Sequence, residues 1–112
     1  MDITVTRESG WVIARVAGRL DGTTMQAAES ELLALIGQGE RRMLLDLTAL
    51  EYISSAGLRV LLSAAKKMKA SGGTIALFGL SANVREIFRL SGFDKIFSIY
   101  ESQEEALGQA GG

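Results

Sequence analysis

The sequence predicts a single α/β domain in which a mixed, mostly parallel sheet of about five strands is flanked by helices. Three observations support this fold class. The chain has 112 residues, 47% of them hydrophobic, which suits one domain with one core. Two β-rich runs open the sequence as a hairpin, and segments with helical and strand character then alternate. The resulting order, β-β-α-β-α-β-α-β-α, favours parallel pairing with one antiparallel edge.

The first half of the chain supplies the hairpin, a helix and a buried strand. Apolar and polar residues alternate over residues 3–6, and a second β-rich run covers residues 11–16 after a Glu-Ser-Gly turn. From Thr24 the period becomes helical until Gly37, with one apolar face formed by Ala28, Leu32, Leu35 and Ile36. Residues 42–47 are nearly all apolar, as expected of a strand that is buried on both faces.

The second half continues the alternation. A second helix is expected to begin near Ser55 and to end at the Ser-Gly-Gly segment of residues 71–73. A strand, a helix, a short strand and a closing helix then follow, at residues 74–78, 81–90, 96–99 and 101–107. The third helix should point its apolar residues inward, namely Val84, Ile87, Phe88 and Leu90. We expect the domain to span residues 1–108, with residues 109–112 as a frayed tail.

The composition excludes several functional classes. The chain contains no histidine and no cysteine, which removes the Ser-His-Asp relay, the commonest metal ligand and thiol chemistry. The glycine motifs that hold nucleotide phosphates are also absent. With 12 basic and 13 acidic residues the net charge is -1, which disfavours nucleic acid and anionic membranes as partners. We therefore expect a non-enzymatic protein without an intrinsic cofactor or metal, and the lack of a leader or membrane-spanning pattern indicates the cytoplasm.

Two adjacent serines, Ser54 and Ser55, stand where the second helix is expected to begin. Either hydroxyl can cap the helix, which is worth about 1 kcal/mol. One cap needs one serine, and the small residues Ala56 and Gly57 leave the other hydroxyl accessible. A phosphate there would suit the helix N-terminus, yet it would place a charge of about -1.5 to -2 in any contact surface. From the residues alone, simple capping and a phosphorylation switch both remain open.

Five segments, taken in order, resemble the STAS domain, in particular that of the bacterial anti-sigma factor antagonists: Gly18–Asp21, Asp46–Thr48, Tyr52–Leu58, Ser71–Gly73 and Leu90–Phe97. The resemblance covers nearly the whole chain, and that family has the order of elements given above. In the family, a serine in a D-S-S-G-L type segment is phosphorylated by an anti-sigma factor that is also an ATP-dependent kinase. Only the unphosphorylated form binds this kinase and frees the sigma factor.

Alignment through Gly57 and Leu58 implies that Ser55 is the phosphorylation site, with Ser54 the less favoured candidate and the helix cap. This sequence departs from the family pattern twice, because Ser54 replaces the usual aspartate and Ala56 replaces a frequent second serine. The missing aspartate leaves Asp46 or Asp21 to shape the surroundings of the acceptor, or makes phosphorylation less efficient.

The resemblance also implies a partner and a binding surface. The partner would be an anti-sigma factor of the serine kinase type, which supplies ATP and magnesium itself, and a phosphatase could remove the phosphate. The surface would comprise Asp21, Ser54, Ser55, Ala56, Gly57 and Arg59. The second helix carries Arg59, Lys66, Lys67 and Lys69 but no acidic residue, so its exposed face is either simply solvated or a docking surface for acidic groups.

The sequence leaves two alternative functions open. The same fold could serve as a scaffold or sensor module that binds a phosphatase or another signalling protein, with Ser55 unmodified. A small-ligand or nucleotide-binding module is the second alternative, and it would require a groove that the sequence does not reveal.

Overall fold

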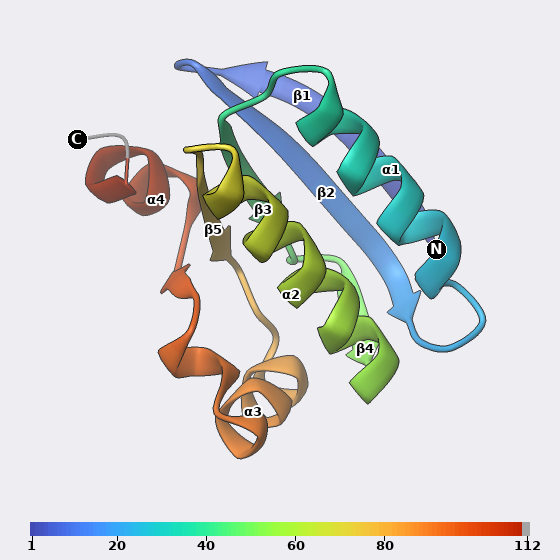
Figure 1. Cartoon of the computed structure of the whole chain (residues 1–112). Coiled ribbons are helices and arrows are strands. Elements are labelled where there is room, and N and C mark those ends of the chain that lie inside the picture. The colour runs from blue at the N-terminus through green and yellow to red at the C-terminus, as the bar shows by residue number, and fades with distance from the viewer. Residues whose placement is uncertain (111–112) are drawn as a thin grey trace.

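The computed structural model describes residues 1–110 as an α/β domain (Figure 1). The elements, in chain order, are β1 (Asp2–Glu8), β2 (Trp11–Leu20), α1 (Met25–Gly37), β3 (Arg42–Asp46), β4 (Leu50–Ile53), α2 (Ser55–Ala70), β5 (Thr74–Phe78), α3 (Ala82–Ser91), the 3-10 helix η1 (Phe93–Lys95), β6 (Ser98–Tyr100) and α4 (Gln103–Ala110). The expected alternation of strands and helices after an opening hairpin is confirmed except at one point, where β4 follows β3 without an intervening helix.

The six strands form one mixed sheet. Its order is β1-β2-β3-β5-β6, and β4 pairs with β2 beside this path. The β1–β2 pair is antiparallel, whereas β2–β3, β2–β4, β3–β5 and β5–β6 are parallel. The predicted fold class, a mostly parallel sheet with one antiparallel edge, is therefore confirmed.

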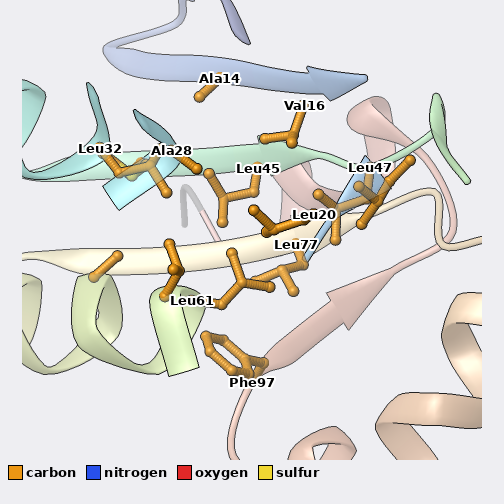
Figure 2. Packing of buried hydrophobic residues seen from close by; sticks show 14 of the residues in the cluster. Ala14, Val16, Leu20, Ala28, Leu32, Leu45, Leu47, Leu61, Leu77 and Phe97 are labelled. Atoms are coloured by element: carbon orange, nitrogen blue, oxygen red, sulfur yellow. The ribbon is translucent and has the colours of Figure 1, made fainter. Parts of the chain in front are cut away.

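Each face of the sheet has its own core. Val12, Ala14 and Val16 of β2 face the larger cluster beneath α1 and α2, and Figure 2 shows Leu45, Leu61 and Leu77 in the same cluster. The intervening residues Trp11 and Ile13 face a smaller cluster with Phe78 and Ala106 of α4. This alternation follows from the two-residue period of a strand, and it places α2 and α4 on opposite faces.

One strand was not expected from the sequence. β2 is ten residues long, and its pairing with β3 ends at Arg15 and Asp46. The rest of β2 would expose unpaired backbone groups, and β4 fills this place by pairing with Gly18, Arg19 and Leu20. The prediction of about five strands is corrected to six for this reason.

The C-terminal third differs from the expectation in three details. η1 occupies residues 93–95, so the last strand begins at Ser98 rather than at residue 96. α4 runs from Gln103 through Ala110, later at both ends than expected, and residues 111–112 of the expected tail lie outside the described part of the chain. Leu90 was predicted to point inward, but it is 71% exposed, and Ile87 is half-buried.

Candidate functional site

Pairing between β2 and β4 brings two distant loops together at one end of the sheet. Leu20 lies opposite Ile53, and the backbone N–H of Ser54 donates to the carbonyl oxygen of Leu20 at 3.0 Å. The next residues on each segment, Asp21 and Ser54, are therefore neighbours. Figure 1 shows the starts of α1 and α2 at this same end, where the parallel strands β2 and β4 finish. This end is where α/β sheets commonly bind their partners.

The two serines at the start of α2 have separate roles. Ser54 has an extended backbone, and its Oγ accepts a hydrogen bond from the backbone N–H of Gly57 at 3.3 Å. This geometry confirms Ser54 as the N-cap. Ser55 is the first residue of α2 and is exposed, and its hydroxyl forms no hydrogen bond within residues 1–110. The hydroxyl of Ser55 is thus available to another protein.

This division of roles predicts different stabilities for two matched variants. Replacing Ser54 with alanine removes the cap and should lower the free energy of unfolding by about 1 kcal/mol. Replacing Ser55 with alanine should change the free energy of unfolding by less than about 0.5 kcal/mol, because the deleted hydroxyl is exposed and makes no hydrogen bond within residues 1–110. Urea unfolding of both proteins measures the difference. Equal destabilisation by the two substitutions would contradict the assignment of the cap to Ser54.

Asp21 holds the loop before α1 in a fixed conformation. Its carboxylate accepts hydrogen bonds from Thr23 Oγ1 at 2.7 Å and from the Thr23 backbone N–H at 2.9 Å, and Arg19 Nε lies 3.5 Å away. The hydrogen bonds from Thr23, followed by the charge of Arg19, hold the pKa of the Asp21 carboxyl below its usual value. The loop before α1, which lies beside Ser54, therefore holds a negatively charged carboxylate in a fixed position.

Asp46, the other acidic residue considered for this site, lies elsewhere. It alternates with Leu45 and Leu47 of the larger core, so its side chain faces the side of the sheet opposite α2. Its carboxylate accepts hydrogen bonds from the Thr48 hydroxyl at 2.6 Å and from the Thr48 backbone N–H at 3.0 Å. Of the two acidic residues, Asp21 is the one whose backbone lies beside the start of α2.

An open groove of about 430 Å³ lies beside Ser55, between the β4–α2 junction and α3. It is lined by Tyr52, Ile53, Ser54, Ser55, Leu58, Ile87, Leu90 and Ser91. The guanidinium of Arg19 stacks over the Tyr52 ring, 4.5 Å from its centroid. The contribution of α3 was missed from the sequence, although helical geometry already places Leu90 roughly 200° from the core residue Phe88.

Some of the binding residues proposed from the sequence lie on the surface, and others are buried beneath it. Asp21, Ser54, Ser55 and Arg59 lie at the same end of the molecule, and the side chain of Arg59 is exposed one helical turn after Ser55. Ala56 is half-buried, and Gly57 is fully buried where α2 approaches β2. Gly57 therefore supports the surface rather than forming part of it.

The described residues limit the chemistry of this site. Residues 1–110 contain no cluster of three acidic side chains that could hold a metal ion. In the same part of the chain, no helix has the length and apolar character needed to cross a membrane. The sequence also lacks histidine and cysteine, so a Ser-His pair at Ser55 is excluded.

Comparisons with known proteins agree on one family. The STAS domain model matches residues 2–106. BtrV of Bordetella bronchiseptica, whose name assigns it provisionally to the anti-sigma factor antagonists, is 42% identical over 106 residues, which cover 95% of this chain and 91% of BtrV. The anti-sigma-F factor antagonist RsfB of Mycobacterium tuberculosis is 28% identical over 98% of this chain and 90% of its own.

The fold agrees equally well. The solved STAS domain of an anti-sigma-factor antagonist from Planctomyces limnophilus superimposes with a TM-score of 0.89, at 26% identity and over 100% of both chains. The family model, the relatives and the fold all point to the same assignment: this chain belongs to the STAS domain family, among the anti-sigma factor antagonists.

Proposed function

We propose that the unmodified protein binds an anti-sigma factor of the serine kinase type through the surface around Ser55, and that phosphorylation of Ser55 ends this binding. The surface comprises Asp21, Ser55, Arg59 and the groove beside Leu90, which we call the Ser55 surface. Binding occupies the anti-sigma factor and so releases its sigma factor. The protein is then a substrate of the kinase and a regulator, and ATP and magnesium come with the partner.

The observation that carries this proposal is the contrast between the two serines. Ser54 Oγ is occupied by the Gly57 N–H, whereas the Ser55 hydroxyl is exposed and without a hydrogen bond among residues 1–110. A kinase can reach Ser55 without unfolding α2. The first turn of α2 also contains no acidic residue, so its N-terminus has room for the charge of a phosphate.

The groove supports the proposal that a phosphate on Ser55 opposes binding. Ser55 and Leu90 line the same groove, and Leu90 is 71% exposed. A large apolar side chain so exposed contributes to affinity when a partner covers it. A phosphate at Ser55 would remain hydrated, and covering it together with Leu90 would require the partner to desolvate a double charge. The modification thus opposes binding directly at the contact surface.

The experiment that tests the proposal uses wild-type protein and the Ser55→Ala and Ser55→Asp variants as baits in lysate of the native organism. An ATP-binding, kinase-like protein should be retained by wild type and by Ser55→Ala and lost with Ser55→Asp. A Leu90→Asp bait should also retain less of it, because a charge then lies in the groove. Incubating the retained protein with magnesium and ATP should add one phosphate to wild type, mapped to Ser55 by mass spectrometry.

Two controls make the result specific. Ser54→Ala removes a neighbouring hydroxyl and should still retain the kinase and accept the phosphate at Ser55. Equal retention by the wild-type, Ser55→Ala and Ser55→Asp baits would overturn the switch and favour an unmodified scaffold. A phosphate mapped to Ser54 would overturn the choice of acceptor.

A further inference from the structure

A second groove lies at the other end of α2, away from Ser55. Its volume is about 410 Å³, and it is lined by Leu62, Ala65, Lys66, Lys69, Gly73, Thr74, Ile75 and Ile96. Three separate parts of the chain form it: the last turns of α2, the start of β5 and the segment after η1. None of these residues lines the groove beside Ser55. The two hollows are therefore distinct surfaces.

The floor of the second groove is apolar and partly open to solvent. Ile96 is 56% exposed, and Leu62, Ala65 and Ile75 are half-buried. An isolated exposed isoleucine would need no explanation, because single apolar residues are common on protein surfaces. Here four apolar side chains line one hollow, which is the pattern of a surface that another molecule covers.

The rim of the second groove is basic and lacks internal partners. Lys66 and Lys69 line it, and α2 contains no acidic residue. The salt bridges within residues 1–110 use five arginines, Arg7, Arg15, Arg19, Arg85 and Arg89, and none of them involves a lysine. Charge complementarity therefore calls for a partner that carries acidic groups.

We propose that this basic apolar groove is a docking site for an acidic amphipathic helix of a partner protein. From Leu62 to Lys69 the groove follows α2 for about 10 Å, or two helical turns. Such a length suits a helix that presents apolar anchors at positions i, i+4 and i+7 to the groove. Glutamate or aspartate side chains flanking the anchors would pair with Lys66 and Lys69.

Docking here would not depend on the phosphorylation state of Ser55. Lys66 and Lys69 lie eleven and fourteen residues after Ser55 on the same helix, distances of about 17 and 21 Å. The Debye length at physiological ionic strength is about 8 Å, so a phosphate on Ser55 is screened from this site. The groove could then hold the protein beside a partner while the Ser55 surface engages and releases its own. This proposal rests on residues that the Ser55 switch does not use.

The test uses a synthetic amphipathic helix as the probe, with leucines at i, i+4 and i+7 and glutamates on its flanks. In ¹⁵N-HSQC titrations we expect saturable shifts at Leu62, Ala65, Ile75 and Ile96. Lys66→Glu should weaken the affinity about tenfold or more, because the introduced carboxylate would face the glutamates of the peptide, and Ile96→Asp should weaken it to a similar extent by placing a charge against the leucines. Both positions are exposed, so the variants should unfold at the same denaturant concentration as wild type.

Matched controls separate the groove from general charge effects. Lys67→Glu makes the same charge change on the next residue, which does not line the groove, and should alter the affinity less than about twofold. Ser55→Asp should also leave the affinity unchanged, which distinguishes this site from the switch. The proposal is overturned if the peptide does not bind, if a lysine version of it binds equally well, or if Lys66→Glu and Lys67→Glu have equal effects. Concentration-dependent dimerisation that Ile96→Asp abolishes would also overturn it, in favour of a second copy.

Discussion

Replacing Gly57 with alanine is expected to lower the free energy of unfolding by about 2–3 kcal/mol, near the upper end for overpacking a core. In an isolated helix the same change would stabilise by up to about 1 kcal/mol, because alanine is the better helix former. The sign reverses here because α2 comes very close to β2 at this position. A Cβ added to Gly57 would lie 2.5 Å from the carbonyl oxygen of Leu20 and 2.8 Å from Cγ1 of Ile53.

The Leu20 carbonyl cannot easily move aside, because it accepts the hydrogen bond from the Ser54 N–H that joins β2 to the start of α2. Gly57→Ala must therefore shift the first turn of α2, and with it the two serines. Gly37→Ala provides the matched control, since Gly37 is also helical and a Cβ there would meet no atom within 4 Å. Guanidinium unfolding should show a loss for Gly57→Ala and no loss for Gly37→Ala. Equal stability of the two variants would contradict the close approach.

The parts of the fold that follow local periodicity could be predicted from the sequence. The two-residue alternation in β2 and the helical period of α1 reflect which face each residue buries, and this information is local. β4 was not predictable in this way, because its four residues exist as a strand only where β2 extends beyond β3. The prediction that Leu90 points inward is wrong, because apolar character alone does not decide burial and the angular position of Leu90 on α3 directs it outward.

In the candidate site, too, some features follow from the local sequence and others depend on how distant segments pack. Local residue types predicted that one of the two serines caps α2 and that the other is accessible, because capping depends on a few adjacent residues. The family resemblance then favoured Ser54 as the cap, and the structure confirms it. The groove beside Ser55 joins the β4–α2 junction to α3, segments that are separated by about thirty residues, so local patterns could not reveal it. The choice between Asp21 and Asp46 likewise required the structure, because it depends on the pairing of β2 with β4, which brings Asp21 beside the start of α2, and on the face of the sheet to which Asp46 points.

Phosphorylation of Ser55 is expected to weaken binding of the anti-sigma factor more than a hundredfold, which corresponds to about 3 kcal/mol. At the same time it should leave the free energy of unfolding unchanged or raise it by up to about 1 kcal/mol, since a phosphate complements a helix N-terminus. The first turn of α2 contains no acidic residue, and the exposed Arg59 lies one turn further on. Calorimetric titration of the purified partners measures the affinity, and urea unfolding of the phosphorylated and unmodified proteins measures stability.

The two measurements together distinguish two ways in which the proposed switch would operate. If phosphorylation acted by disrupting α2, affinity and stability would fall together, and the Ser54→Ala variant would lose affinity in proportion to its lost cap. If the phosphate acts at the contact surface, affinity falls while stability does not. The unobstructed position of Ser55 and the separate cap at Ser54 favour the second mechanism, because the modified oxygen has no structural bond to lose. A phosphorylated protein that unfolds more readily than the unmodified one would contradict it and place the switch in the folding of α2.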